Sequence, residues 1–290
     1  MIEVGNDGAF RTNSVGTDRS PFPLSFTACE TDGWWQISAS AAQADELTDV
    51  LSRSANDTVL LVDLATVSFL HEDLQQWRPS LIAAEQGVDF TAHPLGAWAS
   101  GTPGLGDEIL VMHRNSLPRF LDGSWSPYEL TLVDVPAVPG PARLDEIALI
   151  MGTAATDEPV LPRLKGSGLW YSGHDDCYLA VETADPTVPA SILNRLLALL
   201  AGSALAGARA TSSVVIPEPD VTTTGRLIGE SPHWIGVVAA ASETSVTIEL
   251  SALPQPWQLG EQPPEHVDCT ATLDLTRGAW RVALPPGSAL

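Results

Sequence analysis

The stretch Gly33–Leu70, GWWQISASAAQADELTDVLSRSANDTVLLVDLATVSFL, decides the fold. Trp34–Ser40 alternates in polarity like a β-strand. Ser40 with Gln43 three residues later forms a capping-box pattern, and an amphipathic helical pattern follows it. Thr58–Leu64 is an almost continuous apolar run, which is typical of a strand buried on both faces. A compact strand–helix–strand unit of this kind predicts a right-handed parallel crossover.

The strand that begins at Trp34 is predicted to be the second arm of a hairpin. Leu24–Glu30 is its first arm, and Asp32-Gly33 is a strong turn signal. Side chains alternate across a strand, so one set should point to the core (Trp35, Ile37 and Ala39) and the other outward (Trp34, Gln36 and Ser38). Exposed Trp is favoured at binding hot spots, and we therefore predict an interface at Trp34 and Gln36. Coverage of this face by another layer of the fold is the alternative.

The segment Asp57–Leu70, DTVLLVDLATVSFL, resembles the central strand of STAS-type regulatory domains in its D-L-x-x-V-x-F-L spacing. The resemblance covers about fifteen residues, and such domains continue with an Asp-Ser phosphorylation switch. Here His71 and Glu72 follow instead. The resemblance therefore describes one strand and not membership of the family.

The same order of hairpin, helix and strand starts again near Leu169, with a helix at Ala190–Leu205 and a strand at Thr211–Ile216. Either an internal duplication or the recurrence of a common motif explains it. We predict an α+β or α/β fold of mixed sheets and a few helices, in which two similar hairpin–helix–strand units form a pseudo-symmetric pair. The expected organisation is a loose arm (1–23), a first α+β unit (24–156) and a second, strand-rich unit (157–290). The last unit should hold strands at Arg226–Ile228, His233–Ala240, Ser245–Leu250, Val267–Leu275 and Trp280–Leu284.

The charge of the chain limits the classes of partner that it is expected to bind. The formal net charge is -22, and Lys165 is the one lysine in the chain. Such a chain repels nucleic-acid backbones and anionic membranes, and we expect neither as a partner. A basic protein partner is the class that the charge favours, although genome composition alone is the simpler explanation of an acidic, lysine-poor chain.

The compartment is predicted from the cysteines and the apolar segments. The three cysteines are far apart, which indicates reduced thiols rather than a disulfide framework. The first residues lack the cationic and apolar regions of a signal peptide. The longest apolar segment, Ala190–Ala206, is interrupted by Asn194 and Arg195, so no membrane span is expected. These features together favour a cytoplasmic protein.

The sequence lacks the common catalytic and cofactor motifs. It contains no G-x-S-x-G nucleophile elbow, no phosphate loop with its lysine and no Cys/His pairs at zinc spacing. We therefore expect no cofactor and no metal. The first hypothesis is a non-enzymatic acidic protein that binds a basic protein as an adaptor, a regulator or an immunity-type inhibitor.

An enzyme whose site is assembled from dispersed residues is the competing hypothesis. Its candidates are Asp63 and His71 near the end of the buried strand, and His174 and Asp175 in the second hairpin turn. Ordinary first-turn carboxylates of a helix, and Asp in a turn, explain the same residues without chemistry. A pocket in which these groups converge would distinguish the two hypotheses.

Overall fold

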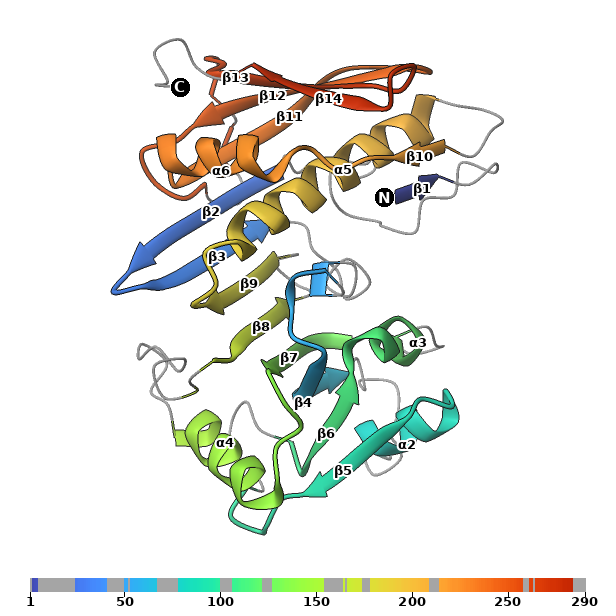
Figure 1. Cartoon of the computed structure of the whole chain (residues 1–290), viewed down its shortest axis with the longest axis vertical. Helices are drawn as coiled ribbons and strands as arrows, with labels where there is room; N and C mark the ends of the chain where they lie inside the picture. Colours follow the sequence, from blue (N-terminus) through green and yellow to red (C-terminus); the bar gives the residue numbers. More distant parts are fainter. Residues whose placement is uncertain are drawn as a thin grey trace. The chain divides into compact units, whose positions relative to one another are not determined.

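The chain is a mixed α+β protein in two compact units (Figure 1). The computed structural model describes residues 2–4, 24–40, 50, 51, 53–66, 78–99, 106–121, 127–153, 164, 166–173, 178–208, 214–257, 261, 262 and 264–283. Unit 1 comprises Met1–Gln43, Asp176–Leu179 and Asp185–Leu290, and unit 2 comprises Ala44–Asp175 and Ala180–Ala184. These units follow different boundaries from the predicted domains, because the hairpin at residues 24–40 pairs with a C-terminal strand.

Unit 1 contains an antiparallel sheet in the order β14-β13-β12-β11-β2-β3. Its strands are β2 (Leu24–Thr31), β3 (Trp34–Ser40), β11 (His233–Ser242), β12 (Ser245–Ala252), β13 (Cys269–Asp274) and β14 (Ala279–Ala283). The predicted strands at 233–240, 245–250, 267–275 and 280–284 are thereby confirmed to within a few residues. β9 (Tyr178–Thr183) is divided between the two units.

One face of the unit 1 sheet is apolar and buried. Burial alternates along β2 and β13, as expected for a sheet with one core face and one polar face. The buried side chains on this face include Phe26, Ile37, Ile248, Leu250 and Leu273. Helix α5 (Val188–Ala208) contacts β2, β11 and β12 and supplies the apolar surface against which they pack.

Helix α5 is buried almost all round, as its composition predicts. Among the described residues, one helical window is long and apolar enough to cross a membrane, Val188–Leu205, and 89% of it is buried inside the structure. A core helix passes the same test of length and composition. Arg195 is 4% exposed. Its Nη1 lies 3.1 Å from Oε1 of Glu218, which compensates the buried charge.

The predicted strand at Arg226–Ile228 is wrong, because these residues belong to helix α6 (Val221–Glu230). Asp220 caps this helix and accepts hydrogen bonds from the backbone N–H and the hydroxyl of Thr223, both at 3.1 Å. The β-branched run after Asp220 suggests a strand, but the cap and the burial of Leu227 outweigh that local preference. The indole Nε1 of Trp234 donates to the main-chain carbonyls of Leu227 and Ser231 and so caps the C-terminal end of α6.

The first residues of the predicted loose arm form a strand. β1 (Ile2–Val4) pairs antiparallel with β10 (Val214–Ile216), and both contact α5. Residues 5–23 lie outside the described part of the chain.

Unit 2 contains an antiparallel sheet in the order β8-β7-β4-β6-β5. Its strands are β4 (Thr58–Thr66), β5 (Phe90–Pro94), β6 (Glu108–His113), β7 (Pro127–Val135) and β8 (Gly168–Gly173), and its helices are α2 (Pro79–Glu85), η3 (Arg114–Ser116), α3 (Leu117–Leu121) and α4 (Pro141–Thr153). The consecutive burial of Val59–Val62 confirms that β4 is covered on both faces.

The parallel crossover predicted for Gly33–Leu70 does not make its two strands neighbours in the sheet. Both edges of β4 are occupied by antiparallel neighbours, β6 and β7. A central antiparallel strand that is covered on both faces has the same continuous apolar run as a parallel strand, so the run alone does not give the direction of pairing. The fold is accordingly α+β. The predicted pseudo-symmetric pair is not confirmed, because β4 is a central strand whereas its counterpart β10 lies in a two-stranded ribbon.

A buried carboxylate joins three parts of unit 2. Asp134 of β7 is 4% exposed. Its Oδ2 accepts hydrogen bonds from the backbone N–H and the side-chain amide of Asn56, at 2.8 and 2.7 Å, and its Oδ1 accepts one from Trp170 Nε1 at 2.8 Å. A Cβ at Gly168, which pairs with Asp134 in the sheet, would lie 2.1 Å from Oδ1. Glycine at this position therefore makes room for the carboxylate.

Substitution Asp134→Ala should destabilise the chain by about 3 kcal/mol, because it leaves the buried indole and amide donors without their acceptor. Urea unfolding followed by circular dichroism measures the loss. Asp89→Ala removes an exposed carboxylate from the same unit and should change the stability by less than about 0.5 kcal/mol. Equal midpoints for the two variants would contradict the role given to Asp134.

Candidate functional site

The residues predicted for a dispersed catalytic site are mostly beyond what the structure describes. Asp63 is half-buried on β4, at a register shift against β7, where it pairs with Thr131. His71, His174 and Asp175 lie outside the described residues. Their convergence with Asp63 therefore stays a prediction.

The outward face predicted for β3 agrees with the burial of its side chains. Ile37 and Ala39 are buried, whereas Gln36 is exposed and Trp34 is half-buried. Trp35 was expected in the core with Ile37, but it is only half-buried. It lies on the core side of the strand next to the turn, where the hairpin extends beyond the buried part of the sheet.

The tip of the β2–β3 hairpin has a fixed register. Asp32 and Gly33 have φ angles of 54° and 80°, the left-handed conformation that a two-residue type I′ turn requires. The turn places Thr31 opposite Trp34 and Glu30 opposite Trp35. Figure 1 shows this turn at the outer end of the two blue strands, away from the long helix α5.

The tip carries carboxylates and indoles, and none of the cationic side chains that the structure describes pairs with them. Glu30 and Asp32 are exposed, and residues 24–40 include neither Lys nor Arg. Among the described residues, none forms a side-chain hydrogen bond or an ion pair with Glu30, Asp32, Trp34 or Trp35. Within the described part of the chain, the tip therefore presents unpaired negative charge beside accessible aromatic surface.

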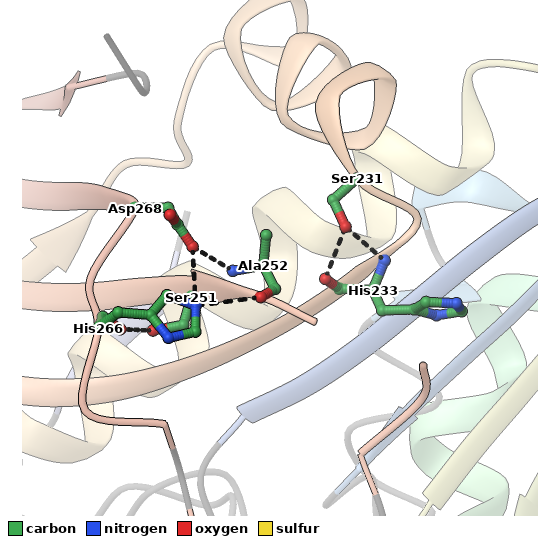
Figure 2. Close-up of polar contacts among 6 residues, drawn as sticks. All are labelled: Ser231, His233, Ser251, Ala252, His266 and Asp268. Atoms are coloured by element: carbon green, nitrogen blue, oxygen red, sulfur yellow. Dashed lines mark hydrogen bonds and ion pairs between the residues drawn. The ribbon is translucent and has the colours of Figure 1, made fainter. Parts of the chain in front are cut away.

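A second group of polar residues lies at the ends of β11 and β12 (Figure 2). Ser251 donates its hydroxyl hydrogen to the main-chain carbonyl of His266, and the Nε2 of His266 lies 3.3 Å from both Asp268 Oδ2 and the carbonyl of Ala252. Asp268 also accepts from the N–H of Ala252 at 2.8 Å. Because both neighbours of Nε2 are acceptors, that nitrogen carries a proton.

This group contains the residue types of a Ser-His-Asp triad in a different geometry. In a triad the hydroxyl donates to an imidazole nitrogen, whereas Ser251 donates to a main-chain carbonyl. The bonds join the end of β12 to the segment that leads into β13. We infer that Ser251, His266 and Asp268 close the base of this long Pro-rich connection, a structural role that sequence reasoning did not predict.

His233 lies at the start of β11, on the other side of Figure 2. Its backbone is held by Ser231, whose hydroxyl donates to the His233 carbonyl at 3.0 Å, and its Nδ1 lies 3.1 Å from the hydroxyl of Thr27. Burial lowers the pKa of the His233 imidazole below its ordinary 6.5. The ring is therefore neutral at physiological pH.

The described cysteines are free thiols, Cys29 half-buried and Cys269 buried. Burial, with a smaller effect from the charge of Asp268, raises the pKa of the Cys269 thiol to about 12. Within the described residues, no group of three or more His, Cys, Asp or Glu side chains is arranged to hold a metal ion. The expectation that the chain uses no cofactor or metal stays untested.

The imidazole of His233 should titrate below pH 6.5 in an NMR experiment on the folded chain. Because its pKa is lower folded than unfolded, the unfolded state binds more protons as the pH falls. The stability that the neutral ring provides is complete above pH 6.5 and is lost as the pH falls through the folded pKa. His233→Gln should flatten this part of the stability–pH curve. A midpoint at or above 6.5 would contradict the burial effect.

Cys269 should resist alkylation by iodoacetamide at about pH 8 in the folded chain, because its thiol stays protonated and buried. Peptide mapping by mass spectrometry measures the labelling, and the same reaction in concentrated guanidinium chloride gives the unfolded reference. Cys29, which is half-buried, is the internal control and should react first. Equal labelling rates for the two thiols in the folded chain would refute the assignment.

Comparison with protein-family models, with curated proteins and with solved structures gives no match to this chain. The resemblance to STAS-type domains therefore stays confined to β4 and the residues that follow it. A functional interpretation has to come from the chain's own charge, surface and geometry.

Proposed function

We propose that this chain is a non-enzymatic acidic protein that binds a basic protein partner, as an adaptor, a regulator or an immunity-type inhibitor. The observation that carries the proposal is the outward side of β3, where Gln36 is exposed and Trp34 half-exposed. They lie beside the carboxylates of the hairpin tip, which have no ion-pair partner among the described residues. Aromatic side chains within a charged rim are the usual anchors of protein interfaces.

The distribution of charge supports a basic partner. Several described arginines already pair with carboxylates of the same chain: Arg114 with Asp57, Arg143 with Glu146 and Arg195 with Glu218, at 3.1, 2.6 and 3.1 Å. Other exposed carboxylates have no ion-pair partner among the described residues, namely Glu85, Asp89, Glu230, Glu243 and Glu265. With a net charge of -22, the surface attracts cationic proteins at long range.

Affinity capture from the organism that encodes the chain, followed by quantitative mass spectrometry, tests the proposal. The expected result is a basic protein retained in stoichiometric amount at low salt and released as ionic strength rises, because screening weakens charge attraction. Trp34→Ala should reduce the affinity of the purified partner by at least about tenfold.

Trp98→Ala is the matched control for that variant. Trp98 is 47% exposed and lies in the turn after β5 of unit 2. Its substitution should leave binding unchanged. The proposal fails if no stoichiometric partner is captured at low salt, if the partner is acidic, or if Trp34→Ala and Trp98→Ala bind the partner equally well.

A further inference from the structure

We propose that Glu30 and Trp35, which face each other across the hairpin, form a binding site for an arginine side chain of the basic partner. The inference rests on the proposed function and specifies the chemistry of recognition. It also places the arginine contact on the face of the hairpin opposite to Trp34. The partner would therefore contact both faces of the hairpin tip.

The register brings the carboxylate and the indole together. Glu30 and Trp35 are directly opposed in the antiparallel ladder, and such a pair shares one face of the sheet with Cβ atoms about 5 Å apart. They lie on the same face as the buried pair Ala28 and Ile37, one step nearer the turn. Glu30 is exposed and Trp35 half-exposed, so burial decreases from the core toward the tip on this face.

The chemistry of this pair selects a guanidinium group. A planar guanidinium stacks on an indole face and at the same time donates two parallel hydrogen bonds to a carboxylate. A lysine ammonium is a compact, strongly hydrated charge that gains less from either contact. Residues 24–40 contain no Lys or Arg, and among the described residues no ion pair is formed with Glu30. The pair is therefore open to a cation that the partner supplies.

The opposite face of the tip differs in a way that supports this assignment. There Trp34 lies opposite Thr31, a neutral residue, and Gln36 lies opposite Cys29. On that face, Trp34 and Gln36 can contact a partner, but neither is paired with a carboxylate on the opposite strand. Asp32 in the turn adds a negative charge that attracts a basic partner. Glu30 and Trp35 are therefore the pair on the hairpin that joins charge and aromatic surface on one side.

The test compares fluorescein-labelled octa-arginine and octa-lysine peptides, which carry equal charge, by fluorescence anisotropy with the full chain at low salt. We expect octa-arginine to bind about threefold to fivefold more tightly, the size of an exposed cation–π contact. Glu30→Gln and Trp35→Leu should each remove this preference. Trp35→Phe, which keeps an aromatic face, should retain part of it.

Glu85→Gln is the matched control, because it removes one exposed carboxylate from α2 in the other unit. It should weaken both peptides equally and leave the preference for arginine intact. Thermal unfolding of each variant establishes that it is folded. Equal binding of the two peptides to the unmodified chain, or an equal effect of Glu30→Gln and Glu85→Gln on the preference, overturns the arginine site and leaves the acidic-binder function standing. Failure of both peptides to bind overturns the two proposals together.

Discussion

The left-handed backbone at Asp32 and Gly33 is the constraint on which the candidate interface depends. A two-residue turn of this type leaves one register for the strands it joins, and a shift by one residue would move every side chain to the other face. The register buries Ile37 with the core and leaves Gln36 outside. The same constraint opposes Glu30 to Trp35, so a local backbone requirement determines which chemical groups meet at the tip.

Much of the fold could be predicted from local patterns. The Asp-Gly turn, the alternation along β2 and β3 and the apolar length of α5 each carry their own structural signal. The direction in which β4 pairs could not be predicted, because a strand covered on both faces reads the same in parallel and antiparallel sheets. The helix at Val221–Glu230 was missed because the strand was expected at Arg226–Ile228, whereas the cap at Asp220 and the burial of Leu227 favour a helix there.

The buried polar cluster around Asp134 could not be predicted from local sequence patterns, for a different reason. Asp134 receives hydrogen bonds from Asn56 and Trp170, which are far from it in sequence, and pairs with Gly168 in the sheet. No short motif encodes such a cluster, since its members become neighbours only when the register of β7 and β8 is set. Residue types alone do not give the role of Ser251 and His266 either, because side chains of the kinds found in a catalytic group serve main-chain hydrogen bonding there.

Charge and geometry contribute to the proposed interface at different ranges. The excess of carboxylates acts over a Debye length and favours any cationic protein, so it brings a partner to the surface without choosing its orientation. Orientation requires short-range contacts that cannot be satisfied elsewhere on the chain. The hairpin tip provides them because its indoles are held at a fixed register beside Glu30 and Asp32, and because Arg114, Arg143 and Arg195 are each paired with a carboxylate in other elements. An acidic surface becomes selective in this way only where a rigid turn holds aromatic side chains next to the charge.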